Sequence, residues 1–244
     1  MFNKIFMFCL IFSAWTIALT AETFTLRDNL QEAQTGDYLV IAAGKTNSLM
    51  HIYDKRDQSV IIEEIVIPDT KCSQLNWREW VAQNAPGNTS WVLYEIDLNS
   101  GQMIRYYSFT KEGWFEIPEA DNFLFKLLNL TLTKIPDQLR KRIGTASFGA
   151  IDRRPAWQPR VVLDGKIIRN VPFTAWRTQW PKDNSDLSGK NIEIYLPQDH
   201  QLYPAYFPYW LQINGMIGKA KIRVIDSGRS LHSPKPSLDT LSTH

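Results

Sequence analysis

The amino-acid sequence predicts an α+β domain whose main element is an antiparallel sheet. Short segments of alternating or β-branched residues dominate the chain, and Gly, Asn, Asp and Ser separate them. Segments with helical signals are few and short. Strands joined by short connections of this kind are typical of an antiparallel meander.

Alternation and turn residues indicate the individual strands. The longest β-branched run is SVIIEEIVIP, at residues 59–68. The clearest hairpin turn is NSG at residues 99–101, and Asp164-Gly165 marks a second turn inside residues 160–171. The other expected strands are residues 37–43, 49–54, 91–98, 102–109, 191–197 and 219–226, with a further strand beginning at Trp210.

Three segments carry helical signals. Residues 73–87 begin with Ser73 as a suitable N-cap and end at a Pro-Gly pair. Residues 121–132 are almost uniformly apolar, and their length favours a buried helix over a strand. Residues 136–144 open with a proline and close with a glycine, which predicts a short exposed helix.

No internal repeat or low-complexity linker divides the chain. Residues 22–228 are therefore expected to form a single β-rich domain. Residues 229–244 are rich in Ser and Pro, and this composition predicts a flexible C-terminal tail.

The N-terminal segment has the layout of a secretory signal peptide, residues 1–21. Lys4 precedes an apolar run from Ile5 to Leu19, and small residues follow it up to Ala21. We expect cleavage after Ala21, which gives a mature chain that is periplasmic or secreted and spans no membrane. An uncleaved anchor is the alternative, although about 15 apolar residues are fewer than the roughly 20 that cross a bilayer. Cys9 lies deep inside the apolar run, a poor position for lipid attachment.

Charge and cysteine content exclude several classes of protein. The net charge of +2 gives no electrostatic case for nucleic acid, which normally shows as a concentrated basic patch. Cleavage removes Cys9 and leaves Cys72 as the only cysteine. A chain with one thiol has no internal disulfide and depends on an ordinary hydrophobic core, which fits a bacterial periplasm.

Signals for catalysis and metal binding are weak. No histidines have ligand spacing, and the chain contains neither a C-x-x-C pair nor a phosphate-binding loop with its lysine, so we expect no metal and no cofactor. Cys72 precedes a predicted helix, where partial positive charge lowers a thiol pKa, but a nucleophile also needs a histidine base. Glu63 and Glu64 are consecutive strand residues that face opposite sides, so they cannot act on one substrate.

Aromatic residues are the remaining unusual feature, with nine tryptophans in the chain. The stretch YPAYFPYWLQIN, residues 203–214, alternates aromatics with Pro204 and Pro208. These prolines have no amide hydrogen for a central strand, so the stretch begins as an edge or a loop. Aromatic side chains line apolar ligand sites, and they also fill cores. The candidate ligand-binding residues are Trp176, Trp180, Tyr206, Phe207 and Trp210.

The order of elements forms a pattern over most of the mature chain. A signal peptide and a long meander are followed by NIEIYLP (191–197), FPYWLQI (207–213) and KAKIRVIDSG (219–228). This order resembles that of the periplasmic lipoprotein-sorting carriers and their relatives. The resemblance implies a curved sheet or half-barrel, with two or three helices packed on one side and a cavity for acyl chains. The proline-interrupted second half departs from those carriers, and no single residue is transferred from them.

Three functions are consistent with these features. The first, which we expect, is an exported noncatalytic carrier or binding protein for an apolar ligand, a lipid or lipoprotein acyl group, in the bacterial envelope. The second is an envelope hydrolase that uses Cys72 or a carboxylate that the sequence does not single out. The third is a secreted protein–protein interaction module that presents the aromatic loop to an envelope partner.

Overall fold

The structure is a computed structural model that describes residues 22–72, 75–115, 123–145, 152–215 and 218–241. The predicted signal peptide, residues 1–21, lies outside the described residues. None of the described helices is long and apolar enough to cross a membrane.

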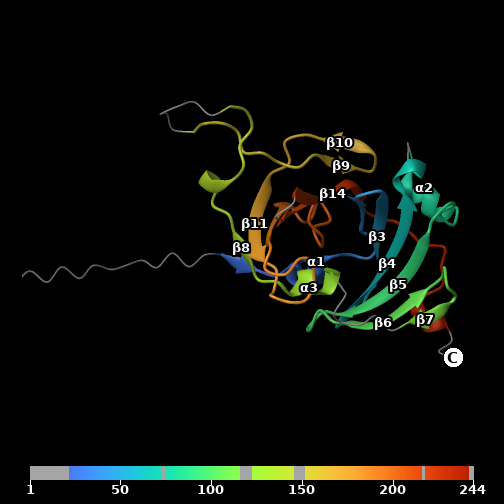
Figure 1. The fold of residues 1–244 in the computed structure, drawn as a ribbon. Coiled ribbons are helices and arrows are strands. Elements are labelled where there is room, and N and C mark those ends of the chain that lie inside the picture. The colour runs from blue at the N-terminus through green and yellow to red at the C-terminus, as the bar shows by residue number, and fades with distance from the viewer. Residues whose placement is uncertain (1–21, 73–74, 116–122, 146–151, 216–217, 242–244) are drawn as a thin grey trace, which may run out of the picture.

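Twelve strands form one open, curved sheet in which all neighbours pair antiparallel (Figure 1). They are β1 (Thr23–Phe24), β2 (Tyr38–Ala43), β3 (Thr46–Lys55), β4 (Ser59–Pro68), β5 (Ser90–Asp97), β6 (Met103–Ser108), β7 (Gly113–Phe115), β8 (Leu132–Lys134), β11 (Phe173–Gln179), β12 (Asn191–Pro197), β13 (Trp210–Gly215) and β14 (Gly218–Gly228). The order across the sheet is β1-β8-β11-β12-β13-β14-β2-β3-β4-β5-β6-β7. The pairing of β14 with β2 therefore joins the C-terminal strands to the N-terminal meander.

A small hairpin lies outside the main sheet. It consists of β9 (Val161–Leu163) and β10 (Lys166–Ile168), which pair only with each other. Both residues of its turn have positive φ, 48° for Asp164 and 75° for Gly165, as the favoured two-residue hairpin turn requires. The Asp164 amide donates to Ser227 O at 2.8 Å, which attaches the hairpin to β14.

The central strands are apolar on both faces. In β2, Leu39 and Ile41 belong to the inner core on the concave side, whereas Tyr38 and Val40 belong to a second cluster on the outer side. This division follows from strand geometry, since successive side chains point to opposite faces. Both faces of the sheet therefore need a cover.

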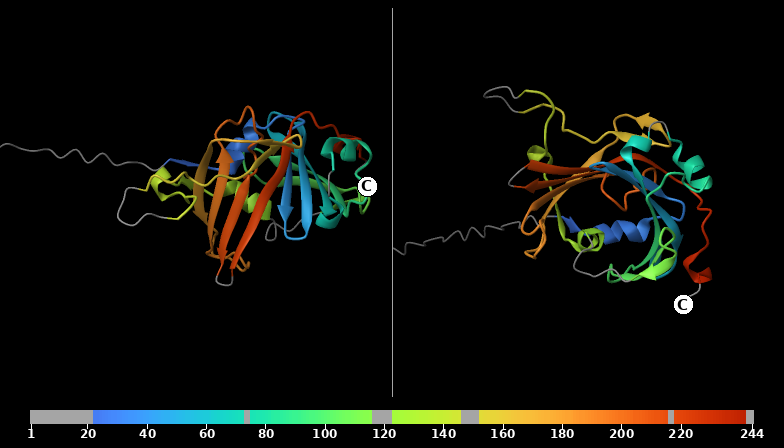
Figure 2. Two further views of the ribbon diagram at one scale, coloured as in Figure 1. Left: turned by 90° about the horizontal axis from the view of Figure 1, so that it is seen from above. Right: turned by 45° about the vertical axis from the view of Figure 1, so that its right-hand side comes forward.

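Two helices, α1 (Leu26–Glu32) and α3 (Phe123–Asn129), cover the concave face (Figures 1 and 2). At the start of α1, the Thr25 amide donates to the Asp28 carboxylate at 2.8 Å, which satisfies a free donor at the helix end. Leu26 and Leu30, one turn apart, are buried against the sheet. The two helices also contact each other.

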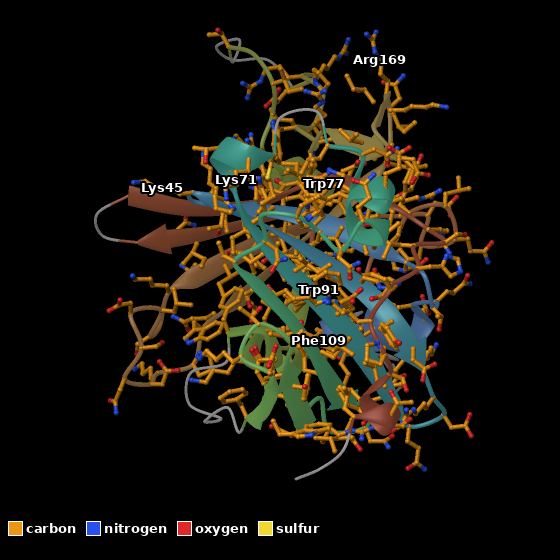
Figure 3. All side chains as sticks on the ribbon, turned by 90° about the vertical axis from the view of Figure 1, so that its right-hand side faces the viewer. Lys45, Lys71, Trp77, Trp91, Phe109 and Arg169 are labelled. Carbon is orange, nitrogen blue, oxygen red and sulfur yellow. The ribbon has the colours of Figure 1, made fainter. Side chains whose placement is uncertain are left out.

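The outer face is covered first by α2 (Trp77–Ala82). The Asn76 side chain accepts from the Glu79 amide at 3.4 Å and caps the helix. Trp77 and Trp80 pack edge to face, with ring centroids 5.6 Å apart, and both are buried. Figure 3 looks onto this side, where Trp77 is labelled beside Trp91 of β5.

The C-terminal segment 229–241 covers a further part of the outer face, next to α2 and over β4 and β5. Leu231 joins the cluster under α2, and Leu238, at the start of a 3-10 turn (η4, Leu238–Thr240), is fully buried against β4 and β5. Asp239 forms an ion pair with Arg105 at 2.6 Å. The described part of the predicted flexible tail is thus packed, because its scattered leucines find apolar partners on the sheet.

The predicted fold class, a curved, mainly antiparallel sheet with helices, is confirmed. The helices do not all lie on one side, however, because α2 packs on the outer face. Residues 136–144 contain a 3-10 turn, η3 (Asp137–Leu139), instead of a helix. A second 3-10 turn, η1 (Asp69–Lys71), precedes Cys72.

We predict that Leu238→Ala lowers the free energy of unfolding by about 2–5 kcal/mol, the usual cost of removing a buried leucine side chain. Urea unfolding measures this change. Leu139→Ala is the matched control, since Leu139 is 67% exposed, and its effect should stay within about 0.5 kcal/mol. Equal stability of the Leu238 variant and the wild type would show that the segment does not pack on the sheet in solution.

Candidate functional site

A small pocket of about 170 Å³ opens on the concave face, and its lining is mainly apolar. Strands β2 to β5 form its floor, the start of α3 forms one wall, and Phe207 and Ile222 come from the C-terminal half. The lining residues are Ile41, Ala43, Thr46, Ser48, Met50, Glu64, Tyr94, Phe123, Leu124, Phe207 and Ile222.

Strand alternation explains which side chains reach this pocket. Ser48 and Met50 are two positions apart in β3, and Ser48 pairs with Val66 while Met50 pairs with Glu64 of the neighbouring strand. Glu64 in turn pairs with Val92 of β5, so Tyr94, two positions on, reaches the same face. The polar members of the pocket are therefore held by sheet register and not by flexible loops.

Glu64 is the ionisable group of the pocket. Ser48 Oγ donates to Glu64 Oε1 at 2.7 Å. Removal from water among apolar side chains raises the pKa of Glu64, and the Ser48 hydrogen bond opposes this rise. The carboxyl group thus takes up a proton more readily than an exposed glutamate, which makes the pocket more nearly neutral.

Tyr94 supplies a second polar group. Its hydroxyl is buried and has no hydrogen-bond partner among the described residues. Burial raises the pKa of Tyr94, and the nearby charge of Glu64 adds to the effect. A buried hydroxyl without a partner is costly, and a ligand that accepts its hydrogen bond would recover part of this cost.

The five aromatic residues predicted to bind a ligand do not all line one pocket. Phe207 lines the concave pocket. Tyr206 is buried in the same inner core, and its hydroxyl donates to Met50 O at 2.7 Å. Trp210 lies on the outer face, where it contacts Trp157. The prolines break regular alternation before β13, so the sequence does not reveal this division between faces.

The two other predicted tryptophans are buried core residues. Trp176 packs on Phe24 with ring centroids 4.2 Å apart, and it is buried. Trp180 stacks on Phe123, with centroids 5.4 Å apart and ring planes 10° apart. Because Phe123 lines the pocket, Trp180 supports one wall without reaching the cavity.

Sequence reasoning missed most of the pocket. Ile41, Met50 and Glu64 are inward-facing positions of predicted strands, and alternation alone indicates that they share a face with other inward residues. It does not indicate where the helical cover ends and leaves space, which depends on the placement of α3.

Cys72 does not have the surroundings of a nucleophile. It follows η1 and lies ahead of the α2 cap Asn76, and its Sγ lies 3.3 Å from Pro68 O. Burial raises the pKa of its thiol, whereas a reactive cysteine needs a lowered pKa. The geometry gives no support to a thiol-dependent hydrolase.

Glu63, the neighbour of Glu64, lies on the other face in a buried polar cluster. Its carboxylate accepts from Trp91 Nε1 at 2.8 Å and from the Ser233 hydroxyl, and it lies 2.9 Å from His51 Nδ1. Glu63 and His51 are 0% and 2% exposed, so no substrate reaches them in this arrangement. The cluster fastens the C-terminal segment to the sheet. Among the described residues, no group of three or more His, Cys, Asp or Glu side chains could hold a metal ion.

The fold and the pocket together define an open, curved antiparallel-sheet protein with a concave apolar site. A sequence model of the CT021 protein family matches residues 48–169, half of the chain, and the chain belongs to this family. Its fold is similar to the solved structure of the hypothetical protein CT021 from Chlamydia trachomatis, with a TM-score of 0.65 and 22% identity over 88% of this chain and 98% of that chain. No curated protein matches. These comparisons show no family of lipoprotein-sorting carriers, so that resemblance stays a prediction.

We predict that Glu64 makes stability fall as pH rises above 4.5, its ordinary pKa. The unfolded chain loses this proton first, so between the two pKa values the folded state binds more protons and the free energy of unfolding decreases. Glu64→Gln cannot ionise and should melt at a higher temperature than the wild type at neutral pH. The difference should vanish below pH 4.5.

Thermal unfolding across the pH range measures this effect, and each kcal/mol corresponds to about 2–4 °C in a chain of this size. Glu79→Gln is the matched control, because it makes the same substitution at an exposed position outside the pocket. If the stability difference between Glu64→Gln and the wild type did not change with pH, the raised pKa of Glu64 in the folded state would be contradicted.

Proposed function

We propose that the protein is an exported, noncatalytic binding protein or carrier for an apolar ligand, a lipid or lipoprotein acyl chain in the bacterial envelope. The observation that carries the proposal is the apolar pocket on the concave face, between the sheet and α3. A curved sheet with helices on its concave side also supports the resemblance in element order to the lipoprotein-sorting carriers.

The size of the pocket limits what it takes. Sites for drug-sized ligands measure about 300–1,000 Å³, and a cavity near 150 Å³ with apolar walls holds a benzene-sized molecule. At about 170 Å³ the pocket suits the end of an acyl chain or a short branched group. Each buried methylene contributes about 0.8 kcal/mol, so a few methylenes give a weak, reversible site of the kind a carrier needs.

The polar groups favour a neutral ligand with an acceptor near its apolar part. The raised pKa of Glu64 favours its uncharged form, and covering an uncharged carboxyl group with an apolar ligand costs less free energy than covering a carboxylate. The buried Tyr94 hydroxyl has no acceptor among the described residues, and in the proposed complex an ester or amide carbonyl accepts its hydrogen bond. Acyl chains joined through ester or amide groups combine these two features.

Export is the second part of the proposal. The apolar run between Lys4 and Ala21 has the composition of a signal peptide, and the mature chain carries a single cysteine. Both features fit a protein that works in the periplasm or outside the cell.

We predict that the protein binds cis-parinaric acid and that Ala43→Phe weakens this binding by about tenfold or more, a loss of about 1.4 kcal/mol. Ala43 lines the pocket, and a phenyl ring there fills the space that the chain would occupy. Ala42→Phe is the matched control: it adds the same ring to the neighbouring residue, which faces the outer side, and it should leave binding intact. Probe fluorescence measures the affinity, and thermal unfolding shows that both variants fold.

Two outcomes would contradict the proposal. Absence of saturable binding by the wild type would remove the ligand class. Equal weakening by Ala42→Phe and Ala43→Phe would place binding outside the concave pocket.

A further inference from the structure

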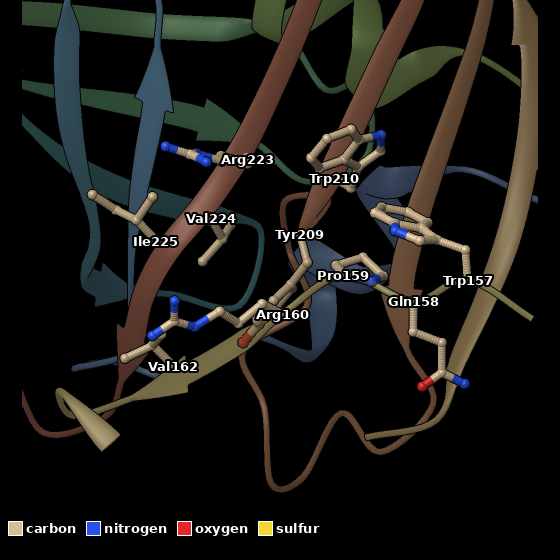
Figure 4. A pocket seen from close by; sticks show the side chains of 10 residues that line it. All are labelled: Trp157, Gln158, Pro159, Arg160, Val162, Tyr209, Trp210, Arg223, Val224 and Ile225. Carbon is tan, nitrogen blue, oxygen red and sulfur yellow. The ribbon is translucent and has the colours of Figure 1, made fainter. Parts of the chain in front are cut away.

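A second pocket, of about 450 Å³, lies on the opposite, outer face of the sheet. It is bounded by residues 157–162, which cross over the outer side of β13 and β14, and by side chains of those two strands (Figure 4). Its volume falls within the range of small-molecule sites. No acidic side chain lines it, but two arginines do, Arg160 and Arg223.

Two tryptophans form one side of this outer pocket. Trp157 and Trp210 pack edge to face, with ring centroids 4.9 Å apart, and both are half-buried. The Trp157 amide donates to Lys141 O at 2.7 Å, which holds the crossing segment in place. The edge of Trp157 also rests on Tyr195, so the indoles belong to a fixed aromatic group on the sheet.

One lysine lies over each of these two rings, and two arginines line the same pocket. Lys141 lies 5.0 Å from the centre of the Trp157 ring, and Lys221 lies 5.6 Å from that of Trp210. Within the part of the chain that the structure describes, neither lysine forms an ion pair, and the same holds for Arg160 and Arg223.

The arginines and the tryptophans lie on different sides of the outer pocket. In Figure 4 the guanidinium groups of Arg160 and Arg223 lie on one side of the pocket, and the indoles of Trp157 and Trp210 lie on the other. Guanidinium groups bind phosphate through paired hydrogen bonds. Indoles offer a flat apolar face to rings, including nucleobases.

The geometry points to a binding site for a phosphate monoester carried on a ring, with the ring against Trp157 and Trp210 and the phosphate on the side of the pocket that Arg160 and Arg223 line. A nucleoside monophosphate and a sugar phosphate share this chemistry. The site goes beyond the apolar-ligand function, because it lies on the other face of the sheet and uses none of the residues of the concave pocket.

Isothermal titration calorimetry at low ionic strength tests the site. The ligands are AMP, glucose 6-phosphate, adenosine, glucose and inorganic phosphate. We expect saturable binding of AMP or of glucose 6-phosphate, with the tighter of the two identifying the ring, and weaker binding of inorganic phosphate and of the uncharged compounds. The affinity should fall as salt is added, because the contacts are exposed charges.

Variants locate the binding. Arg223→Gln and Arg160→Gln should each weaken the phosphate ligand by about 10- to 100-fold, the range for a lost hydrogen bond to a charged group. Trp210→Leu should weaken the binding of AMP or glucose 6-phosphate but not the binding of inorganic phosphate. Arg177→Gln is the matched control, an exposed arginine of β11 that does not line the pocket. Because Arg160 and Arg223 are exposed, their variants should keep the wild-type melting temperature.

Several results would overturn the inference. The first is that neither AMP nor glucose 6-phosphate binds saturably. The second is that inorganic phosphate binds as tightly as they do. The third is that Arg177→Gln weakens their binding as much as the Arg160 and Arg223 variants do. Binding to vesicles of anionic phospholipid without binding of the soluble ligands would also overturn it and would make this face a membrane surface. Ala43→Phe should leave AMP binding unchanged, so failure at this site and failure of the apolar pocket are distinguishable.

Discussion

The structure depends on one constraint: the central strands carry apolar side chains on both faces, and an open sheet cannot hide both by itself. Burial of apolar surface stabilises by roughly 25 cal/mol per Å², so each face acquires its own cover. Helices α1 and α3 cover the concave face, while α2 and the C-terminal segment cover the outer face. The hairpin β9–β10 and the segment before it add a partial cover over β13 and β14. Both pockets occur where these covers are incomplete.

The same alternation gives two neighbouring glutamates different roles. Glu63 lies under the part of the outer face that the C-terminal segment covers, where an indole, a hydroxyl and an imidazole surround its carboxylate. A buried carboxylate without such partners would be strongly destabilising. Glu64 lies under the incomplete inner cover, where Ser48 donates one hydrogen bond and most of the surrounding side chains are apolar. Glu63 therefore holds the C-terminal segment on the sheet, whereas Glu64 lines a pocket that a ligand can fill.

Much of the fold was predictable because strand signals are local. The predicted strands at 59–68 and 191–197 agree with β4 and β12. Helix α1 was missed, although Thr25 and Asp28 form a capping pattern ahead of Leu30, because seven residues are too few for a clear helical period. The site was less predictable: of the aromatic candidates only Phe207 reaches the concave pocket, and Trp210 belongs to the outer one. Composition also hid the packing of Leu231 and Leu238, since burial in a Ser/Pro-rich segment depends on partners far away in sequence.

We place an apolar ligand on the concave face of the sheet and a charged ligand on its outer face. Methyl groups lie on both faces, so their NMR signals distinguish between the two. NMR spectra recorded with a spin-labelled fatty acid measure which methyl groups lie near the bound chain. If the concave pocket is the apolar site, the label broadens the Met50 and Ile222 methyl signals and leaves those of Ile65 and Ile67, on the outer face, sharp. Broadening confined to the outer-face methyl groups, or no broadening at all, would contradict the assignment of the concave pocket.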